Sequence, residues 1–130
     1  MPLLAPPDPK LWRARAEWFQ RAHDTNAPPR AVDASAREDA LLAELEVAFC
    51  AGAWAAVAIL AWAIVEAEER KHPSERPEPE VDWLRERRNA LIHTDPRRGD
   101  EPLPGDAELE EVAQGAVRVA LRVLFAGAWR

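Results

Sequence analysis

Six consecutive residues, from Arg88 to His93, bring together side chains that could perform acid–base and phosphate chemistry. They include the guanidinium of Arg88, the carboxamide of Asn89 and the imidazole of His93. An arginine can bind two phosphate oxygens through parallel hydrogen bonds. A histidine near its usual pKa of about 6.5 can exchange a proton at neutral pH. These three residues are therefore the candidate catalytic group.

A helix expected from Pro79 to about His93 would position this group. At helical spacing four of its apolar residues form one stripe: Val81, Leu84, Leu91 and Ile92. Arg88 falls on the same face of the helix, within this stripe. A buried arginine stem requires its charged head to reach an anion or a cleft. Arg85, Asn89 and His93 follow one another at four-residue intervals on a neighbouring ridge. Two structural alternatives stay open: an internal ion pair at Arg88, and a histidine favoured only by the helix C-terminus.

The charge distribution confines any nucleic-acid contact to one stretch. Asp and Glu outnumber Lys and Arg by 23 to 17, so a basic field over the whole surface is excluded. The segment from Arg85 to Arg98 is different, because its five arginines face only two acids, Glu86 and Asp95. The candidate RNA-binding residues are therefore Arg85, Arg87, Arg97 and Arg98.

The composition favours helices as the elements that carry these residues. Alanine, the best helix former, is abundant, and there are few β-branched residues for sheets. Asp8 and Pro9 predict the start of a first helix that runs to about Arg21, followed by a loop over 23–32. Asp106 predicts the cap of a last helix. We expect one domain over residues 1–130, with its core at about 35–127 and an N-terminal helix and Pro-rich loop over 1–34.

The central part of the chain predicts a long Ala-rich helix. Ser35 and Glu38 form a capping box, and from there to Lys71 only Gly52 discourages helix. Such a helix would be about 50 Å long, whereas a domain of this size has a radius of gyration of about 14 Å. It must therefore kink, with Gly52 as the expected point, or protrude and be covered by a partner. We expect an all-α, four-to-five-helix up-and-down bundle.

The uncharged stretch from Val47 to Val65 is also long enough to be weighed as a membrane span. Its many alanines contribute little insertion energy, and Glu46 and Glu66 flank it with no cluster of Lys or Arg to set an orientation. We therefore expect a buried helix and no membrane contact. The single cysteine, Cys50, cannot form an internal disulfide and fits a reducing cytoplasm, where we expect it to be a small core residue.

The segment Arg88-Asn89-Ala90-Leu91-Ile92-His93 resembles the signature of the HEPN superfamily of helical-bundle proteins: an Arg, a polar residue, a few more residues and a His. Its place at the end of an amphipathic helix, after the Ala-rich segment AILAWAIVEAEER, is also similar to that family. The resemblance covers about residues 35–126. It implies a homodimer in which two copies of the motif face each other across a shared cleft.

The resemblance further implies a metal-independent endoribonuclease that forms 2′,3′-cyclic phosphate ends. His93 would exchange a proton with the ribose 2′-hydroxyl or the leaving oxygen, Arg88 would hold the phosphate, and Asn89 would orient either of them. A glutamate at the position of Glu66 would lie near the motif and pair with Arg88. We expect neither a cofactor nor a metal, because no metal-ligand spacing is seen.

One branch of this family, the toxins paired with nucleotidyltransferase antitoxins, carries a Tyr two residues after the His. Asp95 stands there in this chain, which has no Tyr. Regulation by that route is in doubt, although a toxin or defence role with another antitoxin or partner protein stays open. The alternative function is a non-catalytic HEPN-like bundle that serves as a binding or assembly module.

Overall fold

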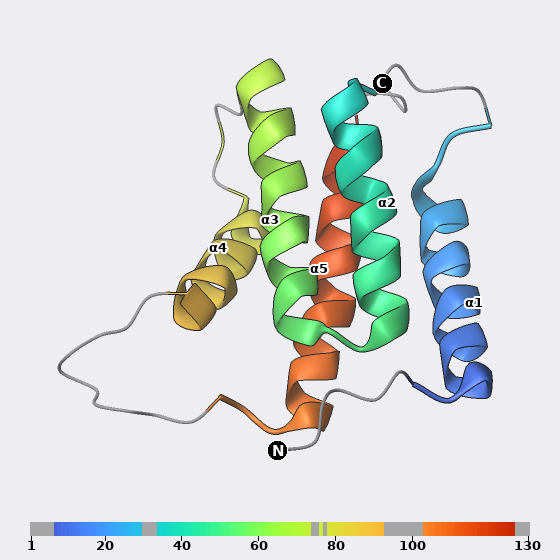
Figure 1. Ribbon diagram of the computed structural model, residues 1–130. Helices are drawn as coiled ribbons and strands as arrows, with labels where there is room; N and C mark the ends of the chain where they lie inside the picture. The colour runs from blue at the N-terminus through green and yellow to red at the C-terminus, as the bar shows by residue number, and fades with distance from the viewer. Residues whose placement is uncertain (1–6, 30–33, 74–75, 77, 93–102, 127–130) are drawn as a thin grey trace, which may run out of the picture.

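The structure is a computed structural model that describes residues 7–29, 34–73, 76, 78–92 and 103–126. This part of the chain contains five helices. They are α1 (Pro9–Asn26), α2 (Ala36–Ala51), α3 (Trp54–Lys71), α4 (Pro79–Ile92) and α5 (Asp106–Ala126). Successive helices run in alternating directions, and α4 is inclined to the others (Figure 1). The described residues contain no strand, so the all-α prediction is confirmed.

The first helix begins as predicted and ends later than predicted. The Asp8 carboxylate accepts a hydrogen bond from the backbone N–H of Lys10 at 2.7 Å, and Pro9 is the first helical residue. The helix continues to Asn26, because a proline restricts only the residue before it and Pro28 therefore leaves Asn26 free to be helical. His23, which was predicted to lie in a loop, is inside this helix and packs edge-on against Phe125.

The predicted long central helix is wrong, because the chain reverses at Gly52. This glycine has a φ of 74°, the left-handed conformation that ends α2, and its N–H donates to the carbonyls of Ala48 and Phe49. A new helix, α3, starts at Trp54 and runs back antiparallel to α2 (Figure 1). The reversal removes the excess length by folding the segment into a helical hairpin. It also divides the uncharged stretch considered as a membrane span.

An arginine from α1 stabilises this turn. Arg15 donates from Nη1 to the carbonyl oxygen of Cys50 at 3.3 Å, and its guanidinium carbon lies 4.7 Å from the centroid of the Trp54 ring. A Cβ atom at Gly52 would lie only 2.8 Å from Arg15 Nη1. Glycine is therefore required here for its left-handed backbone conformation, whereas a Cβ atom would only force the end of the flexible Arg15 side chain to shift.

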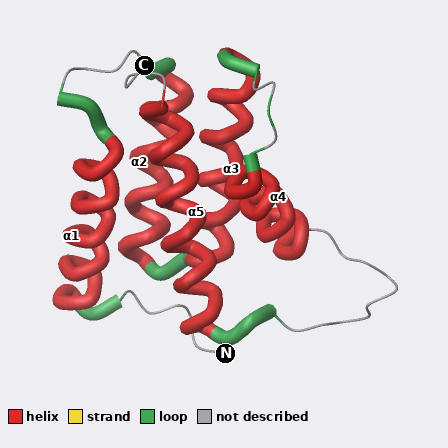
Figure 2. Tube along the Cα trace, turned by 180° about the vertical axis from the view of Figure 1, so that it is seen from behind, coloured by secondary structure: helices red, strands yellow, loops and turns green. Residues whose placement is uncertain are grey.

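The core lies around α3, which packs against α2, α4 and α5 (Figures 1 and 2). Most of its buried side chains are aliphatic or alanine, and the small alanines let the helices approach closely. Cys50 is buried as predicted, and Trp54 and Trp62 also belong to the core. Trp12, by contrast, is 39% exposed. Within the described ranges no helix is long and apolar enough to cross a membrane.

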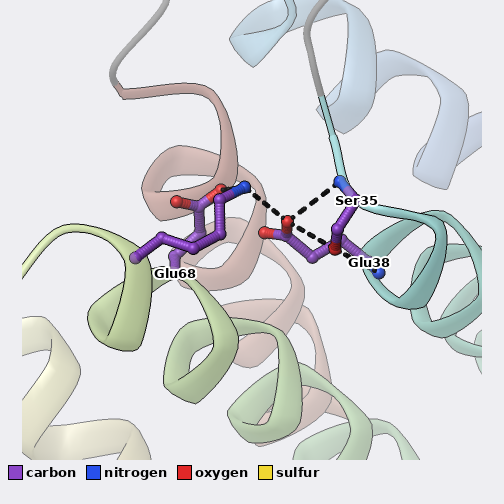
Figure 3. A network of polar contacts seen from close by, with 4 residues as sticks. Ser35, Glu38 and Glu68 are labelled. Atoms are coloured by element: carbon purple, nitrogen blue, oxygen red, sulfur yellow. Dashed lines mark hydrogen bonds and ion pairs between the residues drawn. The ribbon is translucent and has the colours of Figure 1, made fainter.

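A polar cluster around the buried Glu38 joins the open end of the hairpin (Figure 3). Glu38, fully buried in the first turn of α2, accepts hydrogen bonds at Oε1 from the Ser35 hydroxyl at 2.8 Å and from Lys71 Nζ at 2.7 Å. Ser35 in turn accepts from the Glu38 N–H, so the predicted capping box is confirmed. Glu68 lies beside them, with its carboxylate 3.6 Å from Lys71 Nζ. The cluster ties the start of α2 to the end of α3.

The pKa values of the two carboxyls in this cluster are shifted in opposite directions. Burial acts to raise the pKa of Glu38, but interactions with Glu68, Lys71 and Ser35 outweigh it and lower the pKa to about 2. Burial and the neighbouring Glu38 charge raise the pKa of Glu68 to about 7. Glu38 Oε2 is buried with no partner within hydrogen-bond distance, so a protonated Glu68 is the neighbouring group that can donate towards it.

Candidate functional site

The described part of the candidate site lies where α4 crosses α3. Helix α4 is held against the core by Val81 and Leu84, which are buried as the predicted stripe requires. Ile92, which belongs to the same predicted stripe, is 43% exposed at the end of the helix. Arg88 is partly buried, with 21% of its side chain exposed. The partial burial of Arg88 agrees with its place in the predicted stripe.

Arg88 is held between a ring and a carboxylate. Its guanidinium carbon lies 5.5 Å from the centroid of the Trp62 ring, and its Nη2 lies 3.9 Å from Glu66 Oε1. The pairing with Glu66 expected from the sequence is therefore present. Glu66 is 42% exposed and also lies 3.6 Å from Arg70, so this pair is shared and solvent-screened. Such pairs contribute under about 1 kcal/mol, which makes the ion pair a weak reason for burying Arg88.

A second arginine lies over the same tryptophan. The guanidinium carbon of Arg85 is 5.2 Å from the centroid of the Trp62 ring, and its Nη1 is 2.8 Å from Asp82 Oδ1. Arg87, also predicted to bind RNA, is exposed on the same helix. The site therefore carries two cations that share one aromatic ring, and both could reach a bound anion.

Three buried polar atoms in this region have no hydrogen-bond partner among the described residues: Arg88 Nε, Trp62 Nε1 and Asn89 Oδ1. Two of them are donors and one is an acceptor. Trp62 is only 8% exposed, so solvent reaches it poorly. Buried polar groups in folded proteins are nearly always paired, so these three atoms single out this part of α3 and α4 as the candidate site.

Part of the predicted site cannot be placed. His93, Arg97 and Arg98 lie outside the described residues, and α4 ends at Ile92, the residue before His93. The structure therefore brings Arg88 of α4 to Glu66 of α3 and both Arg85 and Arg88 to Trp62, and Asn89 follows Arg88 on α4. Within the described ranges, no group of three or more His, Cys, Asp or Glu side chains is arranged to hold a metal ion.

Trp62 is part of the site although the sequence motif does not include it. The ring is in the core, but it also carries the two guanidiniums of Arg85 and Arg88. The signal that could have found it is its spacing, because Trp62 precedes Glu66 by four residues and both therefore share one face of α3.

Comparison of the chain with protein-family models, with curated proteins and with solved structures finds no match.

Proposed function

We propose that this chain is a metal-independent endoribonuclease of HEPN type whose active site is shared across a homodimer. The observation that carries the proposal is the set of unpaired buried atoms at the α3–α4 crossing: Arg88 Nε, Trp62 Nε1 and Asn89 Oδ1. The guanidiniums of Arg85 and Arg88 and the indole N–H of Trp62 would suit a phosphodiester, whose oxygens are acceptors only. The motif resemblance supplies the reaction class, and the local excess of arginine supports RNA as the substrate.

In the proposed reaction, the ribose 2′-oxygen attacks the neighbouring phosphorus and the bond from phosphorus to the 5′-oxygen breaks. The 2′-hydroxyl gives up its proton and the leaving 5′-oxygen takes one, which produces a 2′,3′-cyclic phosphate and a 5′-hydroxyl. His93 exchanges these protons, and two facing copies of the motif would supply two imidazoles. Arg88 stabilises the additional negative charge on the phosphate oxygens in the transition state. Arg85, Arg87, Arg97 and Arg98 would guide the RNA backbone.

The direct test is cleavage of a panel of single-stranded and structured RNAs in the presence of EDTA. We expect cleavage by the unmodified chain and a loss of about a hundredfold or more in His93→Ala and in Arg88→Gln. The matched controls are His72→Ala and Arg13→Gln, which remove the same residue types at exposed positions and should cleave normally. Equal cleavage by all five proteins would refute the assignment of the site.

The homodimer is tested by light scattering at micromolar concentration, with a dimer expected and a monomer counting against the shared site. A toxin or defence role, in which a partner protein restrains the activity, belongs to the same proposal. It predicts that expression of the unmodified chain slows cell growth while expression of His93→Ala does not.

The second candidate function is a non-catalytic HEPN-like bundle that acts as a binding or assembly module. The contact between Arg88 and Glu66 favours it, because that pair gives Arg88 a structural partner. Under this function no RNA in the panel is cleaved, and Arg88→Gln and Glu66→Gln lower the free energy of unfolding by similar small amounts. Cleavage that depends on His93 would exclude it.

A further inference from the structure

A groove lies on the face of the bundle shown in Figure 2, where α5 runs between α1 on one side and α4 on the other. It has a volume of about 640 Å³, within the range of pockets that hold small organic ligands. The last turns of α1 and the first turns of α4 form its walls, and the middle of α5 forms its floor. It differs from the candidate active site, because Trp83 of α4 contacts α5 whereas Arg85 and Arg88 contact Trp62 of α3.

The surface of the groove is mainly apolar, and its largest apolar side chain is Trp83. This ring rests directly on the backbone of α5 at Gly115, where a Cβ atom would lie only 2.7 Å from Trp83 Cη2. Ala22, Pro79 and Val119 complete the apolar lining. A flat, apolar body would therefore find an aromatic ring and aliphatic surface to cover it.

The groove also contains two arginines on successive turns of α5, Arg118 and Arg122. They differ in whether a carboxylate neutralises their charge. Arg122 is neutralised by the carboxylates of Glu80, at 2.6 Å from its Nε, and of Glu78, at 3.4 Å from its Nη2. Arg118 is exposed and lies with its guanidinium carbon 5.0 Å from the Trp18 ring centroid. Among the described residues no carboxylate pairs with it.

The ring of Trp18 leaves the hydrogen-bonding edge of Arg118 unused, because a cation–π contact occupies only the face of the guanidinium. One fixed cation at the edge of an apolar groove is the arrangement that recognises an amphipathic anion. The anionic head would pair with Arg118 and the apolar body would lie against Trp83.

We propose that this groove is a binding site for a small organic anion with a planar apolar body and a carboxylate, sulfonate or phosphate head. The proposal is independent of the ribonuclease assignment, since none of the groove residues named here belongs to the candidate active site. It requires both parts of the ligand: the head alone would find one exposed cation, and the body alone would leave Arg118 unpaired.

The test is a titration of the ¹⁵N-labelled full chain, followed by NMR, with 1-naphthoate as the probe. Two further titrations test the two parts of the ligand separately. 1-Naphthamide represents the planar body without the charge, and inorganic sulfate represents the anionic head alone. We expect chemical shift changes that include the Gly115 amide and the Trp83 indole N–H. We also expect binding of the amide and of sulfate that is at least about tenfold weaker, as loss of one charge-assisted contact implies.

Two variants and one control locate the site. Arg118→Gln should weaken 1-naphthoate binding about tenfold or more, and Gly115→Ala should weaken it by displacing Trp83. Arg13→Gln removes an exposed arginine on the far half of α1 and should change the dissociation constant less than about twofold. If Gly115→Ala does not fold, the comparison of Arg118→Gln with the unmodified chain still tests the site, because Arg118 is exposed. No saturable binding of 1-naphthoate, or equal binding by Arg118→Gln and the unmodified chain, would overturn the proposal.

Discussion

Replacing Glu68 by glutamine should make the protein more stable at alkaline pH, although it removes a carboxylate from the ion-pair cluster around Glu38 and Lys71. In the folded chain, burial and the adjacent Glu38 charge raise the pKa of Glu68 from its ordinary value of 4.5 to about 7. The folded state therefore holds a proton more tightly than the unfolded state does. Stability from this group is complete below about pH 4.5 and is lost as the pH rises through about 7.

The size of the effect follows from the shift. One pKa unit corresponds to about 1.4 kcal/mol, so the rise from 4.5 to about 7 represents about 3 kcal/mol of unfolding free energy. Glutamine is uncharged at every pH and keeps a donor for Glu38, while Lys71 still pairs with Glu38 at 2.7 Å. Glu68→Gln should therefore match the unmodified protein near pH 4.5 and exceed its stability by up to about 3 kcal/mol at pH 8.

The measurement is urea unfolding followed by circular dichroism at pH 4.5, 6 and 8, at constant ionic strength. The difference in unfolding free energy between the variant and the unmodified protein is taken at each pH. The contributions of the other titrating groups then cancel. Glu44→Gln, which removes an exposed carboxylate from the same hairpin, serves as the control and should give a nearly constant difference. A Glu68→Gln protein that is less stable at pH 8, or whose difference does not grow with pH, would refute the reasoning.

Three further substitutions test the packing by urea unfolding. Gly52→Ala should cost about 1–3 kcal/mol, because the residue has a φ of 74° and a Cβ would lie 2.8 Å from Arg15 Nη1; an unchanged stability would contradict the strained turn. Ser35→Ala should cost about 1–2 kcal/mol by removing the cap and a partner of buried Glu38, and Ser35→Thr should restore most of it. Leu45→Ala should cost about 2–5 kcal/mol, since Leu45 is fully buried; a loss below 1 kcal/mol would mean that this part of the core is loosely packed.

Local sequence signals predicted the starts of α1 and α2 accurately, but not the start of α3 at Trp54. The capping hydrogen bonds at these starts join residues only two or three positions apart, Asp8 with Lys10 and Ser35 with Glu38. They need no contact with another helix, so the local sequence is enough to predict them. The end of α1 was less predictable. A proline sets only an outer limit to a preceding helix, and the contact of His23 with Phe125 shows that the bundle covers the last turns of α1.

The candidate site was predictable in part. The periodicity of α4 predicted that Arg88 would be partly buried, and the motif resemblance predicted its pairing with Glu66 at 3.9 Å. The position of Trp62 beneath Arg85 and Arg88 was not predicted, because it depends on how α4 crosses α3. A crossing is set by side-chain packing between the two helices, which no single-helix pattern contains.

The all-helical composition, the caps and the weak point at Gly52 can all be read from the chain, because each depends on the intrinsic preferences of one residue and its near neighbours. Whether Gly52 would bend the helix or reverse it depends on how α3 packs against α2 and α5, and Arg15 contacts the resulting turn from another helix. The reversal then brings Glu38 within reach of Glu68 and Lys71 and creates the buried cluster. Such contacts between distant residues arise from the packing of whole helices, so they exist only in the folded molecule.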